Sequence, residues 1–270
     1  MSPAATVRPP AVAGAFYPAD PAQLRRMVTR FLEEAVPPPR PFHVPYAVVA
    51  PHAGYVYSGP IAGSAYAPFA ARARDIDTVI LVGASHHFPY RGIAASSMEA
   101  FRTPLGLVPV DRELTEQACE HRSVGYLDEA HAPEHSLEVQ LPFLQMLLPE
   151  FRIVPLLCGA TSYQEIAEVM DLLWEDRRDH SIVVVSSDLS HYLDYDSARR
   201  LDRSTAEAIE DLDPERISEE QACGRIPIGG LLLLARRHGL KVQTVDLRNS
   251  GDTAGPRSEV VGYGAFLFHD

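Results

Sequence analysis

Short apolar runs alternate with longer amphipathic segments along most of this chain. Runs that are rich in Val, Ile and Leu and end at turn residues or polar residues predict β-strands. We expect six such strands, at Tyr46–Ala50, Thr78–Gly83, Arg152–Leu157, Ile182–Ser186, Lys241–Leu247 and Val260–Phe268.

Apolar residues at helical spacing predict helices between these strands. The first helix follows Asp20, a plausible N-cap, with Pro21 at its first position. Ser162 and Glu165 have the spacing of a capping box, which indicates that another helix starts there. That helix is expected at Tyr163–Glu175, and the others are expected at Gly59–Ala70, Arg112–His121, Leu137–Leu148, Ser197–Asp211, Pro214–Gln221 and Ile228–His238.

This alternation predicts an α/β fold, a central sheet covered by helices on both faces. The proline-rich stretch Pro37–Pro45 separates the first helix from the first strand, and Pro142 should kink the helix that contains it. Since no linker is long enough to divide the chain, we expect residues 1–270 to form a single domain.

Polar side chains follow three of the predicted strands. His52 follows the first, His86 and His87 follow the second, and Asp188 and His191 follow the fourth. In an open α/β sheet, ligands bind outside the carboxyl ends of the strands, so these side chains should meet in one crevice. Three such endings in one chain therefore predict a functional site.

Small residues and imidazoles together indicate a metal site. Gly54, Gly83 and Ala84 leave room at this edge of the sheet. Neutral imidazole is a common ligand for transition metals, so two histidines and an anionic group would form a three-ligand site with open positions. Adjacent side chains on an extended segment point in opposite directions, so only one of His86 and His87 should face this site.

Cys223 is a candidate for the third ligand. It lies between two predicted helices, in a turn that Gly224 and Pro227 favour, and Arg225 would stabilise a thiolate. A buried cysteine that acts only as a small hydrophobic residue remains the alternative. The sequence by itself does not bring Cys223 to the histidines.

Glu134 and His135 have two possible roles. They could lie over the same edge of the sheet, or the segment could only cap the helix that follows. Solvation is the default expectation for five other histidines, which lie in loops or on charged helix faces: His43, His121, His180, His238 and His269.

Composition and charge exclude several classes of protein. With 46% hydrophobic and 22% charged residues, the chain is neither disordered nor collagen-like. Its net charge of −12 would repel nucleic acid and anionic membranes. No apolar run is long enough to span a bilayer, and Met1–Pro18 does not have the pattern of a signal peptide. Three widely spaced cysteines argue against a disulfide framework, so we expect a cytoplasmic protein.

Six motifs in order along the chain closely resemble the MEMO family. They are AGAFYP at Ala13–Pro18, APHAGYVYSG at Ala50–Gly59, GASHH at Gly83–His87, EHSLEVQLPFL at Glu134–Leu144, SSDLSH at Ser186–His191 and CGRIPIG at Cys223–Gly229. The family includes protein B of the AmmeMemoRadiSam system and is similar to class III extradiol dioxygenases. The resemblance therefore implies their fold, with a mixed, mostly parallel sheet.

The resemblance also implies roles for particular residues. It places His52, His86 and Cys223 as metal ligands, with His191 as the acid/base group and Asp188 beside it. Fe(II) is the implied metal, with Cu or Zn as alternatives, and AMMECR1-like and radical SAM proteins are the implied partners. The dioxygenases have a carboxylate where this chain has a thiolate, so ring cleavage does not follow. Ile226 replaces a histidine found in some animal members.

Three functions are compatible with these observations. The first is a non-haem Fe(II)-dependent oxidoreductase, in which His191, oriented by Asp188 or Tyr192, moves a proton on a small-molecule or peptide substrate. The second is a non-catalytic scaffold on the same fold that binds a metal or a peptide. A hydrolase that uses zinc-bound water or a serine is the third, and no GxSxG motif supports its serine form.

Overall fold

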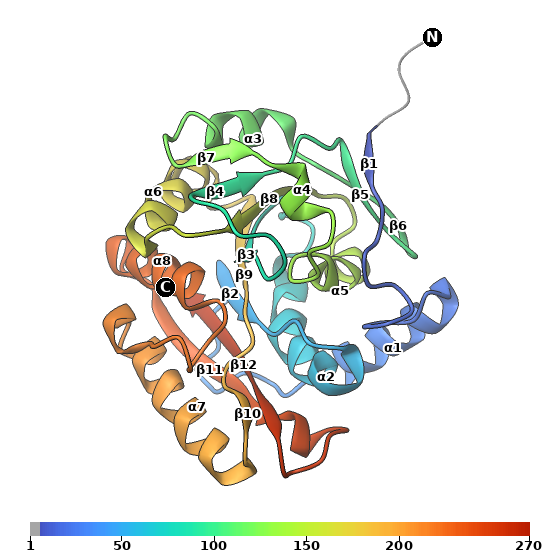
Figure 1. The fold of residues 1–270 in the computed structure, drawn as a ribbon, viewed down its shortest axis with the longest axis vertical. Helices are drawn as coiled ribbons and strands as arrows, with labels where there is room; N and C mark the ends of the chain where they lie inside the picture. Colours follow the sequence, from blue (N-terminus) through green and yellow to red (C-terminus); the bar gives the residue numbers. More distant parts are fainter. Residues whose placement is uncertain (1–5) are drawn as a thin grey trace.

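Four parallel strands form the centre of the molecule (Figure 1). The computed structural model describes residues 6–270. The first five residues of Met1–Pro18, the segment that lacks the pattern of a signal peptide, lie outside the described residues. The central strands are adjacent in the order β2 (Ala47–Ala50), β9 (Ser181–Ser186), β3 (Thr78–Ala84) and β8 (Arg152–Cys158). All four were predicted from their apolar runs.

Antiparallel strands extend this core on both sides. On one side, β12 (Val260–His269) pairs with β2 and also with β11 (Lys241–Asn249) and β10 (His191–Leu193). On the other side, β4 (Ile93–Ala95) pairs with β8 and with β7 (Val124–Tyr126). The result is a mixed nine-stranded sheet. A separate three-stranded sheet contains β1 (Val7–Arg8), β5 (Ala100–Thr103) and β6 (Gly106–Pro109).

Helices cover both faces of the large sheet, because successive side chains of each central strand point to opposite sides. In β2, Val48 belongs to one apolar core and Val49 to the other. The first core includes residues of α1 (Pro21–Glu33), α2 (Tyr55–Tyr66), α4 (Asp128–His131) and α5 (Leu141–Leu147). The second includes residues of α3 (Arg112–Ala118), α6 (Tyr163–Trp174), α7 (Tyr195–Glu210) and α8 (Arg225–His238).

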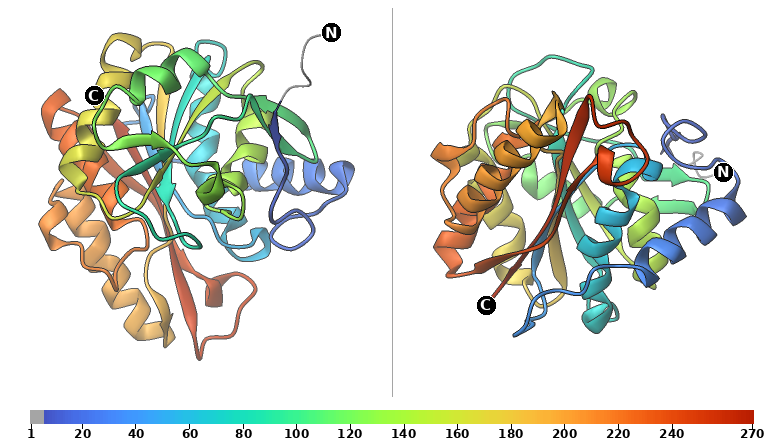
Figure 2. Two further views of the ribbon diagram at one scale, coloured as in Figure 1. Left: turned by 45° about the horizontal axis from the view of Figure 1, so that its top comes forward. Right: turned by 90° about the horizontal axis from the view of Figure 1, so that it is seen from below.

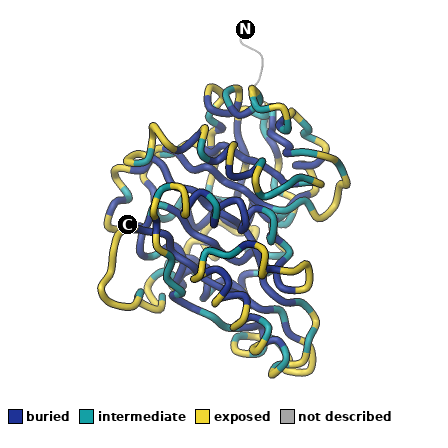
Figure 3. Tube along the Cα trace, turned by 90° about the vertical axis from the view of Figure 1, so that its left-hand side faces the viewer, coloured by how far each residue is buried: buried dark blue, intermediate teal, exposed yellow. Residues whose placement is uncertain are grey.

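The pictures agree with this layered arrangement. In the right view of Figure 2, β12 runs between α7 on one side and α2 on the other. Figure 3 shows the buried segments running through the interior, with exposed loops at the periphery. The predicted α/β fold with helices on both faces is therefore confirmed.

Two helix predictions need correction near prolines. α2 begins at Tyr55, four residues before the expected start, because the Tyr55 amide is held by the Phe16 carbonyl at 2.8 Å. Pro142 kinks nothing, since it lies in the first turn of α5, where proline is tolerated. A short 3-10 helix, η2 (Glu138–Gln140), precedes it.

The expected helix at Pro214–Gln221 was wrong. Only a 3-10 turn, η4 (Pro214–Arg216), forms there, and the Gln221 side chain then accepts a hydrogen bond from the Ser218 amide at 2.8 Å. The chain thus turns instead of continuing as a helix, and it delivers Cys223 to the start of α8. The remaining 3-10 helices are η1 (Ala67–Arg72), η3 (Glu175–Arg177) and η5 (Ser250–Asp252).

One of the five histidines expected in solvent is buried. His269 ends β12, is only 7% exposed and stacks on His43, with ring centroids 5.0 Å apart. Among residues 6–270, no helix is long and apolar enough to cross a bilayer.

The carboxyl ends of the parallel strands lie at one edge of the sheet. Ala50 is paired with Ser186, which is also the register partner of Gly83. The loops that begin at Pro51, Ser85 and Ser187 therefore leave the sheet side by side, as the sequence predicted.

Candidate metal centre

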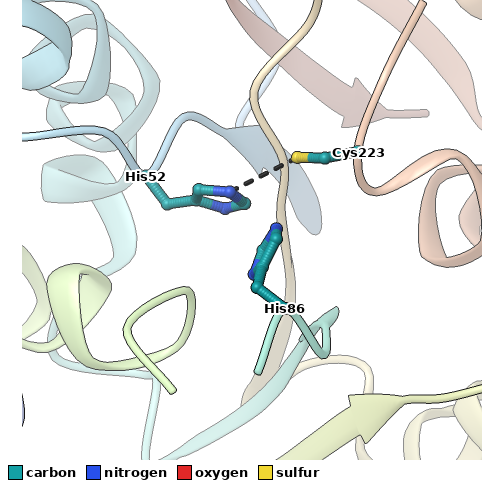
Figure 4. A group of neighbouring side chains, drawn as sticks. All are labelled: His52, His86 and Cys223. Carbon is teal, nitrogen blue, oxygen red and sulfur yellow. Dashed lines mark hydrogen bonds between the residues drawn. The ribbon is translucent and has the colours of Figure 1, made fainter. Parts of the chain in front are cut away.

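Two imidazoles and one thiol converge at this edge of the sheet. His52 follows β2, His86 follows β3 and Cys223 precedes α8, and one ligand atom from each lies within 4.8 Å of the others (Figure 4). The Cys223 Sγ is 3.3 Å from Nε2 of His52. Metal–nitrogen bonds of about 2.0 Å and metal–sulfur bonds of about 2.3 Å fit a cation shared by three atoms at this spacing.

Two glycines allow this convergence. A Cβ on Gly224 would lie 2.6 Å from the Cβ of Ser187, so only glycine lets the Cys223 turn approach the end of β9. The Gly224 amide donates to the Ser187 hydroxyl there at 2.9 Å. At the end of β3, a Cβ on Gly83 would meet Ser136 Oγ at 2.9 Å. Glycine therefore admits the segment that carries Glu134 and His135.

Glu134 orients His86. Its buried carboxylate accepts from the His86 amide at 2.6 Å and lies 2.9 Å from Nδ1 of the same residue. An ionised carboxylate can only accept, so Nδ1 of His86 carries a proton, and in the neutral ring Nε2 presents the lone pair. Such a carboxylate–histidine pair is the usual support of a metal-binding imidazole. This answers the question that the sequence left open for Glu134.

A neutral relay orients His52. The Gln140 Nε2 donates to the Pro51 carbonyl at 3.0 Å and to Ser186 Oγ at 2.8 Å. Ser186 Oγ donates in turn to the Ser136 carbonyl at 2.6 Å. Its only proton is thus used, so Nδ1 of His52, 2.9 Å away, must donate to this oxygen. Nε2 of His52 is then free to bind a metal.

Asp188 supports the His52 loop. Its carboxylate accepts from the His52 amide at 2.7 Å, and the Ala53 amide also donates to it. Burial raises the pKa of Asp188 to about 7, although these amides and His86 oppose the shift. Among the described residues, the hydrogen bonds of the Asp188 carboxylate join it to the His52 loop and none joins it to the ring of His191.

The pKa values of the two candidate imidazole ligands move in opposite directions. Burial, followed by the neighbouring His86 and His135, holds the pKa of His52 well below its usual value. Burial also lowers the pKa of His86, but the contacts with Cys223 and Glu134 outweigh it and raise that pKa to about 10. Burial likewise opposes ionisation of Glu134, yet His86 and backbone amides hold its pKa far below the ordinary range. A metal that binds Nε2 of His86 must therefore displace a proton from this ring.

A cavity of about 580 Å³ is lined by two of the candidate ligands, His52 and His86, whereas Cys223 lines a second cavity of about 420 Å³. His52, His86, His135, Asp188 and His191 all line the larger cavity, and His87 does not. One of the two adjacent histidines thus faces the site, as expected. The other residues around the cavity are mainly aromatic or small: Phe16, Ala53, Gly54, Tyr57, Tyr192, Ser250, Gly255, Pro256, Glu259, Val261 and Tyr263.

The sequence did not indicate the residues that orient the candidate ligands or complete the cavity wall. Ser186 and Gln140 are fully buried within apolar stretches and resemble ordinary core positions in the sequence. A signal was present at Gln140, because a buried amide next to apolar residues needs partners of its own. The role of Phe16, which lies 30 or more residues from every other residue of the cavity, had no local signal.

Comparisons with known proteins agree with the six motifs. The family described as "Memo-like protein" matches residues 8–267. A MEMO1 family protein of Archaeoglobus fulgidus is 38% identical over 97% of this chain and 99% of its own length. A MEMO1 family protein of Methanopyrus kandleri is 36% identical over 97% and 98%, and one of Aquifex aeolicus is 35% identical over 97% and 99%.

One solved structure shares the fold. It is the crystal structure of an uncharacterized protein from Escherichia coli K12, which superposes with a TM-score of 0.52 at 13% sequence identity. The match covers 82% of this chain and 98% of that protein. At this identity it supports the fold alone. The family match and the relatives, each covering nearly the whole chain, establish that this chain belongs to the Memo-like family.

Proposed function

We propose that this protein is a metal-dependent oxidoreductase that holds non-haem Fe(II) through His52, His86 and Cys223. The observation that carries the proposal is that one nitrogen from each of two imidazoles and one sulfur lie within 4.8 Å of one another, and that both imidazoles line a cavity. Three ligands on one side of a cation leave positions for other molecules on the other side. When bound, Fe(II) would supply the capacity to activate O₂.

The chain itself supplies proton transfer. His191 and His135 both line the cavity, and burial lowers the pKa of each, that of His135 to about 4. Both rings are therefore neutral at pH 7 and able to accept a proton from a bound substrate. His191 is our first candidate for this role. Asp188 positions the His52 loop.

The thiolate ligand separates this site from that of a dioxygenase. A sulfur donor is softer than a carboxylate and also suits Cu(I) or Zn. We therefore propose oxidoreduction on a small-molecule or peptide substrate, and not ring cleavage of catechols. AMMECR1-like and radical SAM proteins are the partners that we propose by family resemblance. Co-purification with tagged protein would test them.

Metal analysis of protein purified without air tests the proposal. We expect stoichiometric iron in the wild type and its loss in His52→Ala, His86→Ala and Cys223→Ala. His87→Ala is the matched control, since His87 adjoins His86 but does not line the cavity. Retention of full iron in the His52 and His86 variants would defeat the proposed ligand set, and zinc in the wild type would favour a hydrolase.

A non-catalytic scaffold is the second candidate. It is favoured by exposed apolar and aromatic side chains at Val56, Tyr57 and Tyr192, two of which also line the cavity. O₂ consumption by the iron-loaded protein, measured with partner proteins and candidate peptides, separates the two functions. Turnover that His191→Ala abolishes supports the oxidoreductase, and binding without any turnover supports the scaffold.

A further inference from the structure

Strand β10 contains one residue more than the stretch of β12 that it pairs with. His191 is paired with Val261 and Leu193 with Val260, so Tyr192 is the extra residue of a β-bulge. Its backbone has a φ of 59°, in the left-handed region that glycine favours in such bulges. A tyrosine there is rare, because its Cβ crowds the following carbonyl.

The Tyr192 side chain does little to offset the cost of this conformation. It is 73% exposed, so burial stabilises it only weakly. Hydrogen bonds on either side hold the chain instead. The Leu189 amide donates to the Gly262 carbonyl at 2.8 Å, and the Tyr195 amide donates to the Arg257 carbonyl at 3.2 Å. A strained backbone that the surrounding structure imposes points to a local function.

The bulge brings two consecutive rings to the same side of β10. Successive side chains of a regular strand point to opposite faces. The ring centroids of His191 and Tyr192 are instead only 5.8 Å apart, with 62° between the ring planes, and both residues line the cavity of about 580 Å³. In a regular strand at this place, one of the two rings would point away from the cavity.

The His191 ring is also fixed in its tautomer. One of its nitrogens donates a hydrogen bond to the Leu189 carbonyl, two residues earlier. A carbonyl can only accept, so this nitrogen carries a proton and, in the neutral ring, the other nitrogen presents the lone pair. A group that accepts a proton from a substrate needs such a lone pair.

We infer that Tyr192 is a positioning residue for His191, and that its left-handed backbone, not its phenol, holds the imidazole against Leu189 and beside the cavity. The inference rests on the proposed function for the role of His191 as the proton acceptor. It also decides between Asp188 and Tyr192 as the residue that orients His191, because the Asp188 carboxylate is bonded to the His52 loop.

The tautomer of His191 tests the inference directly. Long-range 1H–15N correlation spectra of the full chain, recorded at pH 8 after chelation of bound metal, show which ring nitrogen carries the proton. The spectrum of His191→Gln identifies the signals by their loss. We expect a single tautomer in the wild type.

Substitutions at Tyr192 separate its backbone from its ring. Tyr192→Asn and Tyr192→Gly should keep the single tautomer, since asparagine and glycine tolerate a positive φ. Tyr192→Val should lose it, because a β-branched residue disfavours this conformation. The two ring nitrogens of His191 should then give averaged shifts.

Leu212→Val is the matched control. Leu212 also has a positive φ, of 54°, but it follows the end of α7 and does not line the cavity. Valine should raise the equilibrium constant of unfolding about tenfold at either position, since it adds strain of the same kind. Only Tyr192→Val should change the tautomer of His191.

Three results would overturn the inference. They are a mixture of tautomers in the wild type, the wild-type tautomer in folded Tyr192→Val, and loss of the tautomer in Tyr192→Asn and Tyr192→Gly, which would assign the positioning to the ring. If Tyr192→Val does not fold, Tyr192→Asn decides. It must keep the tautomer and unfold at no lower urea concentration than the wild type, and failure of either would also overturn the inference.

The outcome is separable from that of the proposed function. The tautomer is measured without metal or substrate, so the positioning of His191 can be established even if the protein never retains iron. Conversely, iron bound by His52, His86 and Cys223 together with a mixed tautomer of His191 would refute this inference alone.

Discussion

The two candidate imidazole ligands are held in the same tautomer by unlike partners. His86 faces the carboxylate of Glu134, whereas His52 faces the hydroxyl of Ser186. Two backbone carbonyls leave the Ser186 hydroxyl able only to accept from His52. The Ser136 carbonyl accepts the hydrogen bond of the Ser186 hydroxyl, and the Pro51 carbonyl fixes the orientation of the Gln140 amide, which donates to Ser186. A neutral partner at His52 adds no further negative charge beside Cys223 and Asp188.

Ser186→Ala should weaken metal binding. Without this acceptor, Nδ1 of His52 loses its partner, and the proton can move to Nε2, where it blocks coordination. Removal of such a supporting hydrogen bond typically costs about 10- to 100-fold in metal affinity. Competition between the protein and a chromophoric chelator for Zn²⁺, a redox-inert probe, measures the change.

Ser190→Ala is the matched control for this experiment. Ser190 is also fully buried and lies four residues along the chain, and no hydrogen bond among the described residues joins its hydroxyl to His52. It should bind zinc like the wild type. If Ser186→Ala, folded by its thermal transition, also keeps wild-type affinity, the relay does not govern His52.

At the residue scale, the polar residues at strand ends could be predicted from the sequence, whereas the residues that orient them, such as Ser186 and Gln140, could not. His52, His86, Asp188 and His191 were found because a polar residue after an apolar run is visible in one dimension. Cys223 was a candidate from its turn, but only the family resemblance placed it with the histidines, since its approach depends on the packing of Gly224 against Ser187. Gln140 reaches Ser186 over 46 residues of sequence, a pairing that no local pattern indicates.

Helix α7 supports the His191 loop through a buried carboxylate. Asp202 accepts from the Ser190 amide at 3.0 Å, and a Cβ on Gly262 of β12 would lie only 2.1 Å from its Oδ2. Burial raises the pKa of Asp202 to about 6, against the opposing effect of the Ser190 amide. The folded protein therefore holds this proton more tightly than the unfolded chain does.

Asp202→Asn should stabilise the protein at pH 8 and not at pH 4. The raised pKa favours the folded state below the unfolded value of 3.8, and this benefit is lost as the pH rises through about 6. Asparagine carries no charge to bury and can still accept from Ser190. We expect a gain of about 1–3 kcal/mol in the free energy of unfolding at pH 8, measured with urea.

The pH dependence distinguishes this cause from general effects of the substitution. Glu207→Gln removes an exposed carboxylate away from the first turn of the same helix and should give equal differences at both pH values. An Asp202→Asn variant that loses stability equally at pH 4 and pH 8 would show that the carboxylate serves only as an acceptor.

Element predictions succeeded where a segment is long and buried. The bounds of the six long strands were correct to within two residues, because each is an apolar run with a clear end. The short strands β1, β4 to β7 and β10 were missed, since two to four residues give too little pattern to recognise. The predicted helix at Pro214–Gln221 failed because Gln221 and Ser218 bond to each other and stop its propagation.

At the scale of the whole molecule, the N-terminal segment is fastened across the first core by one buried carboxylate. Glu138 in η2 forms an ion pair with Arg8 in β1, and both side chains are almost completely buried. It also accepts from the amides of Ala11 and Val12 at 2.6 and 3.0 Å and from the Tyr17 hydroxyl at 2.6 Å. This attachment carries Phe16 to the cavity.

Arg8→Met should destabilise the protein by about 3–5 kcal/mol, because it leaves the charge of Glu138 buried without its cation. The N-terminal segment should also open locally more often while the rest of the protein stays folded. The amide of Gly14, which donates to Tyr17 at 2.7 Å, should exchange its hydrogen faster, whereas amides of β3 should not.

The double variant Arg8→Met/Glu138→Gln should recover part of the stability, since it removes both charges. A double variant less stable than Arg8→Met would mean that Glu138 acts mainly through its bonds to Ala11, Val12 and Tyr17. In that case the segment is held by hydrogen bonds to the carboxylate and not by the ion pair.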